Sequence, residues 1–339
     1  MVRLKLVSKS WKRVISDLCI PQLNSTLSGF FLHLETPTES FPIGDWVFTS
    51  LSGERVLLSD FCFHLLPFKP SPLKFFDCSN GFLLFCEPSV ALHLVNPITK
   101  ECIVVHLHGR KKTPPPEVVS FTFDHTGYHI VYITRFPLQV HVFSSETEKW
   151  TVFGDLYLDS TIVSTMWSKR LFFIRGFCYM LSFSGHMLKF GYKERGVTAI
   201  KLPEFVSIEK YIGSFGVSQG RLHYCDRVAT YSFKIWMLEE SKENWILKHS
   251  LCLQDLAAYQ IPDLQGAKLL AIYGFHPTSD VLFIGHTKRI FSYHPRDKTF
   301  KNICTADPGK CISCGQFLVR LFSQNLILTD SFPSSIKKE

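Results

Sequence analysis

Two kinds of turn recur along this chain in a fixed order, and this repeat restricts the possible folds more than any other feature of the sequence. A turn of the first kind is a pair of residues followed at once by a short apolar run, which indicates two strands joined by a tight turn. Its five examples are Asn80-Gly81, Thr126-Gly127, Lys169-Arg170, Gln219-Gly220 and Ser279-Asp280. A longer polar turn between two strand-like runs follows each of them, at 96–100, 146–149, 193–196, 241–244 and 295–298.

The spacing of the longer turns indicates a repeated unit of three or four strands. Successive turns are 48, 46, 49 and 56 residues apart, measured between Thr99, Thr147, Lys193, Lys242 and Lys298. A period near 50 residues is typical of kelch-like propellers, in which each unit is one blade.

Strand-like runs at both ends complete the ring. Residues 28–60 contain three such runs and form a sixth unit. The apolar stretch Phe317–Leu328 is expected to return to the first blade, so that no free sheet edge remains at the seam. We predict an all-β fold, a kelch-like β-propeller over residues 28–330 with six blades, although the unequal spacing also fits seven. Five aromatic residues should be largely buried between sheets: Tyr132, Trp150, Phe172, Trp245 and Phe300.

The first 20 residues follow a helical period instead. Their apolar residues recur at steps of three and four, on one face of a helix: Leu4, Val7, Trp11, Val14 and Leu18, with Ile15 widening that face. Pro21 ends the pattern. A single helix of this length cannot form its own core, so its apolar face should be covered by another structure.

Three segments resemble one known family. Leu6–Asp17, with the sequence LVSKSWKRVISD, resembles the C-terminal half of the plant F-box motif. Asp77–Leu84 (DCSNGFLL) and Val95–Lys100 (VNPITK) resemble the S-C-N-G-L-L and N-P-T-T-K signatures of the F-box-associated propeller region, in the same order and at the usual separation. The resemblance is strong to about residue 150 and continues beyond it only through the rhythm of the blades.

This resemblance implies three parts: a partial F-box at 1–24, the propeller at 28–330 and a polar tail at 331–339. It implies a substrate-recognition subunit of an SCF-type cullin-RING ubiquitin ligase, in which the propeller loops hold a protein substrate. The F-box helix would contact a SKP-family adaptor, and through it the cullin scaffold. The adaptor-binding residues would be Leu4, Val7, Trp11, Val14 and Ile15. The sequence identifies neither the substrate nor the residues that bind it.

The family's F-box opens with a Leu-Pro-x-Asp segment and a helix ending in Arg-Leu-Pro, and this chain starts after both. We therefore expect the chain as given to bind the adaptor weakly. A chain with a complete F-box ahead of Leu4 should bind it tightly.

Cysteine usage and charge restrict the compartment and the partners. The 11 cysteines are scattered within apolar runs, which favours free thiols in a reducing compartment, the cytoplasm or the nucleus. No run approaches the roughly 18 apolar residues of a membrane helix. Residues 1–20 contain five Lys or Arg and one Asp, so half of the net charge of +8 lies there and the other 319 residues carry only +4. We expect neither a membrane nor a nucleic acid as partner.

Residues that could support chemistry do not form a known motif. Structural zinc needs four ligands, whereas the tightest group has three, Cys304, Cys311 and Cys314, and there is no second Cys-x-x-Cys pair. His106 and His108 are interpreted as polar strand residues. The acids considered for hydrolysis are interpreted as solvated turn residues: Asp155, Asp159, Asp226 and Glu239. No phosphate-binding loop, His-Glu-x-x-His or Gly-x-Ser-x-Gly is present, so we predict no enzyme activity, cofactor or metal.

Two other functions stay open. The first is a stand-alone propeller scaffold without a role in a ligase. The second, less favoured, is a galactose-oxidase-like or carbohydrate-binding kelch protein. Proteins of the second kind are usually secreted with paired cysteines, which the odd and scattered cysteines here do not resemble.

Overall fold

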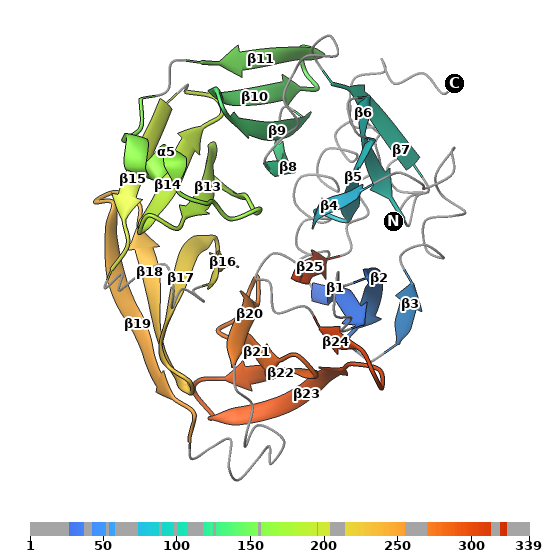
Figure 1. Ribbon diagram of the computed structural model, residues 1–339, viewed down its shortest axis with the longest axis vertical. Coiled ribbons are helices and arrows are strands. Elements are labelled where there is room, and N and C mark those ends of the chain that lie inside the picture. Colours follow the sequence, from blue (N-terminus) through green and yellow to red (C-terminus); the bar gives the residue numbers. More distant parts are fainter. Residues whose placement is uncertain are drawn as a thin grey trace, which may run out of the picture.

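The computed structural model describes residues 27–36, 43–51, 54–57, 74–87, 90–97, 101–107, 118–124, 127–154, 157–194, 196–203, 214–254, 270–312 and 319–323. Their strands form six β-sheets around a central axis, with one short helix, α5 (Ser160–Ser164), beside them (Figure 1). Each sheet is one blade, so the predicted six-bladed, all-β propeller is confirmed. No helix among these residues is long and apolar enough to cross a membrane.

Five blades are built from four consecutive antiparallel strands, with the first strand nearest the axis and the fourth at the rim (Figure 1). Blade 2 contains β4 (Lys74–Ser79), β5 (Phe82–Glu87), β6 (Ala91–Asn96) and β7 (Glu101–His106). Blade 3 contains β8 (Val118–Asp124), β9 (Gly127–Arg135), β10 (Leu138–Ser144) and β11 (Lys149–Phe153). Blade 4 contains β12 (Phe172–Ile174), β13 (Phe177–Ser182), β14 (His186–Gly191) and β15 (Gly196–Lys201). Blade 5 contains β16 (Ser214–Ser218), β17 (Arg221–Ala229), β18 (Ser232–Glu239) and β19 (Asn244–Cys252). Blade 6 contains β20 (Ala271–Phe275), β21 (Leu282–His286), β22 (Arg289–His294) and β23 (Thr299–Thr305).

Blade 1 joins the two ends of the chain. Its outer three strands are β1 (Leu27–Thr36), β2 (Ile43–Ser50) and β3 (Arg55–Leu57). β25 (Val319–Ser323) pairs antiparallel with β1, and β24 (Cys311–Ile312) continues along the same edge. The predicted return of the C-terminal stretch to the first blade is therefore confirmed, and it covers an edge of β1 that would otherwise be unpaired.

Four of the five turns predicted between a first and a second strand lie there, and one assignment was wrong. Blade 4 makes this turn at Arg175-Gly176, between β12 and β13, whereas Lys169-Arg170 precedes β12. A two-residue turn of this type needs positive φ at both residues. Arg175 and Gly176 have φ of 46° and 88°, as Asn80 and Gly81 have 49° and 79°. Glycine at the second position identifies the correct pair, which the sequence analysis overlooked.

All five longer turns lie where they were predicted, between the third and the fourth strand of blades 2 to 6. In three of them the last residue before the outer strand is left-handed: Glu148, Glu243 and Lys298, with φ of 55°, 49° and 53°. The repeat in the sequence thus corresponds to the same turn geometry in blades 3, 5 and 6.

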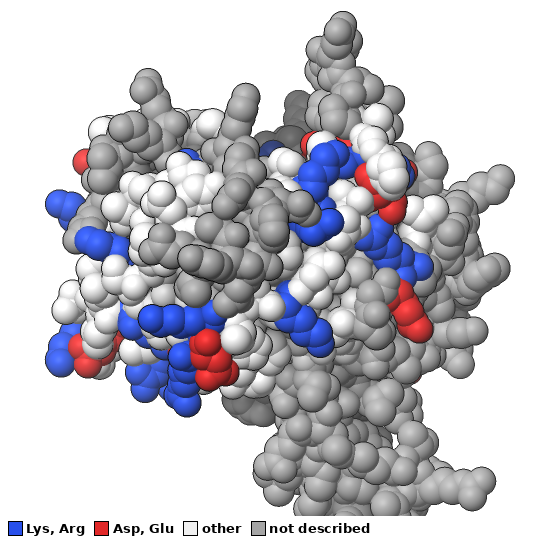
Figure 2. All heavy atoms as spheres, turned by 90° about the horizontal axis from the view of Figure 1, so that it is seen from below, with Lys and Arg blue, Asp and Glu red and all other residues white. Residues whose placement is uncertain are grey.

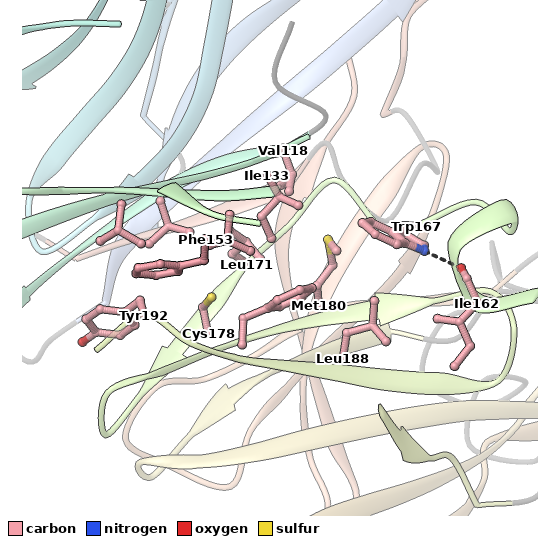
Figure 3. Close-up of a cluster of buried hydrophobic side chains, with 14 residues drawn as sticks. Val118, Ile133, Phe153, Ile162, Trp167, Leu171, Cys178, Met180, Leu188 and Tyr192 are labelled. Carbon is pink, nitrogen blue, oxygen red and sulfur yellow. Dashed lines mark hydrogen bonds between the residues drawn. The ribbon is translucent and has the colours of Figure 1, made fainter. Parts of the chain in front are cut away.

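The core is divided into six clusters, one at each joint between adjacent blades. Side chains alternate between the two faces of a strand, so alternate residues of a blade pack against the blade before it and the blade after it. In β9, Ile130 and Tyr132 belong to the joint with blade 2, and Val131 and Ile133 to the joint with blade 4. Figure 3 shows the second of these joints, between Ile133 of blade 3 and Met180 of blade 4.

The predicted burial of aromatic residues between the sheets is confirmed for two of five. Tyr132 is 3% exposed and Trp245 9%, whereas Trp150, Phe172 and Phe300 are half-buried. Trp150 Nε1 donates to the His106 carbonyl at 2.9 Å, and Trp245 Nε1 donates to the Lys201 carbonyl at 3.0 Å. In both cases the first residues of one outer strand contact the end of the preceding blade's outer strand.

Candidate functional site

The predicted adaptor-binding residues all lie within residues 1–26, outside the part of the chain that the structure describes: Leu4, Val7, Trp11, Val14 and Ile15. The same holds for the tail at 331–339 and for His108 and Cys314. The prediction that this helix contacts an adaptor stays a prediction. Candidate sites within the described residues must come from the propeller.

The two ends of the blades differ in the connections that they carry. Because neighbouring strands are antiparallel, both predicted kinds of turn lie at one end, which we call the turn face. The hairpins between second and third strands, together with the connections from blade to blade, lie at the other end, which we call the hairpin face. α5 belongs to the connection between blades 3 and 4 on the hairpin face.

Residues of the turn face are linked from blade to blade by ion pairs. Lys193 Nζ of blade 4 lies 2.7 Å from Asp124 Oδ2 of blade 3. On the other side of blade 4, Lys189 Nζ lies 2.8 Å from Glu243 Oε1 of blade 5. Exposed pairs of this kind contribute at most about 1 kcal/mol each. These charged groups already pair with one another between neighbouring blades. They are therefore less available to bind a partner than unpaired charges would be.

The hairpin face instead exposes large apolar side chains over blades 3 and 4. Phe136 is 66% exposed and Met166 is 67% exposed. Pro137, also exposed, follows Phe136 in the hairpin between β9 and β10. We call Phe136, Pro137 and Met166 the hairpin-face patch. Tyr157, 91% exposed, lies earlier in the same connection as Met166.

The hairpin-face patch is held on a rigid base. The Arg135 guanidinium lies 5.0 Å from the centre of the Phe136 ring and 5.8 Å from that of Trp167, and its Nη1 donates to the Thr165 carbonyl at 2.9 Å. Trp167 is only 2% exposed, and its Nε1 donates to the Ile162 carbonyl at 2.8 Å (Figure 3). Arg135 therefore links the two segments that carry the patch, and the core below fixes them.

A polar cluster lies at the joint between blades 5 and 6. The Asp280 carboxylate accepts from Lys248 Nζ at 2.7 Å and contacts His249 Nε2 at 3.0 Å. Burial alone would raise the pKa of Asp280, but the hydrogen bonds from Lys248 and His249 and their charges outweigh it, and the pKa is lowered. Asp280 is therefore an ionised group engaged by two partners.

His223 of β17 is the most buried member of this cluster. It is 1% exposed, and Lys248 Nζ lies 3.5 Å from its Nε2. Burial, followed by the nearby Lys248 charge, lowers the pKa of His223 to about 4. The polar groups of the cluster are paired with one another across the joint between blades 5 and 6. We therefore interpret the cluster as a structural link between the two blades and not as a reactive centre.

Three of the cysteine and histidine residues considered for metal binding lie among the described residues, Cys304, Cys311 and His106. Cys304 is 3% exposed, burial raises the pKa of its thiol, and Arg55 Nη2 donates to its Sγ at 3.3 Å. Cys311 is half-buried in β24, and His106 is exposed at the end of β7. Among the described residues, no three His, Cys, Asp or Glu side chains are grouped closely enough to hold a metal ion.

Two of the acids considered for hydrolysis have ordinary local partners. Asp159 accepts from the Thr161 backbone N–H at 2.8 Å and is the N-cap of α5. Glu239 pairs with Lys242 at 3.2 Å. Asp226 is half-buried in β17, and Asp155 lies outside the described residues.

Sequence reasoning missed both the hairpin-face patch and the Asp280 cluster. The patch had a local signal, because Phe136-Pro137 places an aromatic residue at a turn between two strands. The cluster had none, since Lys248 and Asp280 come from different blades.

Comparison with known proteins adds only distant similarity. No protein-family model matches the sequence. No curated protein matches it either. Among solved structures, an oligogalacturonate lyase from Vibrio parahaemolyticus is 10% identical with a TM-score of 0.44, covering 77% of this chain and 71% of that one. A putative 6-phosphogluconolactonase from Bacteroides fragilis is 11% identical with a TM-score of 0.41, covering 83% and 96%.

A chain in the crystal structure of the mitotic checkpoint complex is 12% identical with a TM-score of 0.40, and the match covers 67% of this chain. This chain spans 63% of the length of that one. At such identities and TM-scores, none of these similarities bears on function.

Proposed function

We propose that this chain is a non-enzymatic substrate-recognition subunit of an SCF-type cullin-RING ubiquitin ligase, acting in the cytoplasm or the nucleus. The propeller holds a protein substrate at the hairpin-face patch, and the N-terminal helix contacts a SKP-family adaptor. The observation that carries the proposal is the exposure of Phe136 and Met166, 66% and 67%, on a base fixed by Arg135 and Trp167. Large apolar side chains presented on a rigid surface are typical of the centres of protein interfaces.

The ligase part of the proposal depends on the sequence resemblance of Leu6–Asp17 to the F-box. The described residues of the two propeller signatures have structural roles in the blades, and we do not assign substrate binding to them. Asn80 and Gly81 supply the positive φ of the turn between β4 and β5, and Asn96 is fully buried at the end of β6. Substrate specificity is therefore expected in the exposed loops and not in the signature residues.

The alternative of a stand-alone scaffold differs from this proposal only in that its N-terminal helix does not bind an adaptor. The decisive experiment is a pull-down of purified SKP-family adaptor and cullin by a chain in which a complete F-box precedes Leu4. We expect stable binding, and we expect Trp11→Ala to weaken it about tenfold or more, because losing a large interface side chain costs about 2 kcal/mol. Thermal unfolding of the propeller should not change. If the chain with the complete F-box ignores both proteins, the ligase function is wrong.

The recognition part is tested separately by the double variant Phe136→Asp, Met166→Asp. Its matched control is Val104→Asp, Val152→Asp, which changes two residues of 42% and 40% exposure on outer strands. In proximity labelling in cells, the proteins most enriched by the unmodified chain should no longer be enriched by the patch variant. The control variant should still enrich them. Equal labelling by both variants would contradict a role of the patch.

A further inference from the structure

Blade 6 from β21 onward, with the segment that leads to β24, concentrates positive charge. Residues 281–312 contain six Lys or Arg and two Asp. The cations are Lys288, Arg289, Arg296, Lys298, Lys301 and Lys310. Figure 2 views the molecule from the side on which β23 lies in Figure 1, and Lys and Arg outnumber Asp and Glu there.

Blade 4 is also rich in cations, but it uses them differently. Arg175, Lys189 and Lys193 each pair with an acid of a neighbouring blade. In blade 6, by contrast, none of four cations forms an ion pair with an acidic side chain of the described residues: Lys288, Arg296, Lys301 and Lys310. Asp307, one of the two acids, already pairs with Arg55 of blade 1 at 2.6 Å. These four charges are therefore not neutralised by ion pairs among the described residues.

The same surface includes the edge of a strand. Among the described residues β23 is the last strand of its sheet, so one of its edges has no neighbouring strand there. It is seven residues long, about 23 Å at the usual rise per residue. Thr299, Lys301 and Asn302 are exposed along it. Cations lie near both ends of the strand. Arg296 is in the turn before it, and Lys288 is beside its far end, where the Lys288 backbone carbonyl accepts from the Ala306 N–H at 2.7 Å.

We propose that the outer edge of blade 6 binds an extended, acidic segment of a partner protein, which adds to β23 as a further strand. The backbone edge would supply hydrogen bonds, and the cations around it would select Asp and Glu side chains over neutral or basic ones. This inference is independent of the adaptor and of the hairpin-face patch, because it concerns a different surface.

A polypeptide fits this surface better than a nucleic acid. Single-stranded nucleic acids need exposed aromatic rings on which bases stack. The aromatic residue of β23, Phe300, is half-buried, with its ring centre 4.7 Å from that of Tyr293. A free strand edge, moreover, offers hydrogen bonds that match a peptide backbone.

The test is fluorescence anisotropy with a labelled eight-residue peptide that alternates Glu and Val, added to the full chain. We expect binding that weakens as salt increases. The double variant Arg296→Glu, Lys301→Glu should weaken it at least tenfold. The matched control is Lys242→Glu, because Lys242 is an exposed cation in the corresponding turn of blade 5. Equal loss with the control, or no binding by the unmodified chain, would overturn the proposal.

Two further probes separate strand addition from general attraction. A peptide of the same sequence with alternate backbone amides methylated keeps its charge but cannot pair with β23, so it should bind at least tenfold more weakly. A single-stranded oligothymidylate of equal charge should compete poorly. If the methylated peptide binds equally well, or if the oligonucleotide competes equally, the surface is a general polyanion site and the proposal is wrong.

Discussion

At the scale of the residue, His223 shows how burial sets the chemistry of a side chain. Its Nδ1 lies 3.0 Å from the Arg221 carbonyl, which fits a neutral ring that donates from Nδ1. Lys248 is then placed to donate towards Nε2. With its pKa lowered to about 4, His223 is neutral in the folded protein at neutral pH.

His223 should therefore make the free energy of unfolding depend on pH. The unfolded ring has a pKa near 6.5, so between pH 6.5 and about 4 the unfolded chain binds a proton that the folded chain does not. Stability should decrease as the pH falls through this range, by about 3 kcal/mol from this group. Urea unfolding of His223→Gln at several pH values should show a shallower dependence. Asp280, with a pKa lowered from 3.8, loses its contribution only at lower pH, so it does not obscure the comparison. An unchanged slope would contradict the role assigned to His223.

At the scale of the element, the turns of the blades carry the regularity of the fold. The pair Arg175-Gly176 joins β12 to β13 because Gly176 accepts a φ of 88° without strain. Lys169-Arg170 has neither a glycine nor positive φ, so the apolar run that follows it was not sufficient evidence for a hairpin turn.

Gly176→Ala should destabilise the protein by about 1 kcal/mol, because an L residue in this region of φ is strained. No atom lies within 4 Å of the position that a Cβ would take, so crowding does not contribute. Gly196→Ala is the matched control, since that glycine has equally open surroundings and no positive φ. Thermal and urea unfolding should distinguish the two. Equal effects would show that backbone strain is not the cause.

At the scale of the whole molecule, closure of the ring depends on the pairing of β25 with β1. The joints on either side of blade 1 bury Phe30 and Phe31, both 0% exposed, in different clusters. Phe30 packs against Phe283 of blade 6, and Phe31 against Phe75 of blade 2. Because β1 supplies both joints, it must be held in register for the ring to close.

Ending the chain at Ile312 should open the ring at blade 1. The edge of β1 loses the partner that β25 supplies, and the innermost position of that blade becomes empty. We expect a lower unfolding temperature and rapid cleavage by proteases within residues 27–57. The control is a chain that ends at Ser323 and keeps all of β25. If both shortened chains resist proteolysis equally, closure does not depend on this pairing.

Much of the fold could be predicted because its signals are local. Turn residues and the change from a helical period to alternation depend on neighbours in the sequence, so most strand positions, the blade repeat and the return of the last strand followed from them. The spacing favoured six blades over seven without deciding between them. The proposed function depends on different residues. The N-terminal helix that resembles the F-box lies outside the described residues, and the exposure of Phe136 and Met166 required the arrangement of two blades.

The sequence by itself determined that the chain forms a ring of similar antiparallel blades, since each turn is encoded by the few residues within it. Tertiary structure alone decided which blades meet and through which groups. Along β9 both faces are apolar, so alternation cannot tell which face meets blade 2 and which meets blade 4. Arg55 and Asp307 are 252 residues apart in sequence but 2.6 Å apart in space, because closing the ring joins its two ends. Contacts of this kind depend on how the blades are packed around the axis, and no local pattern records that arrangement.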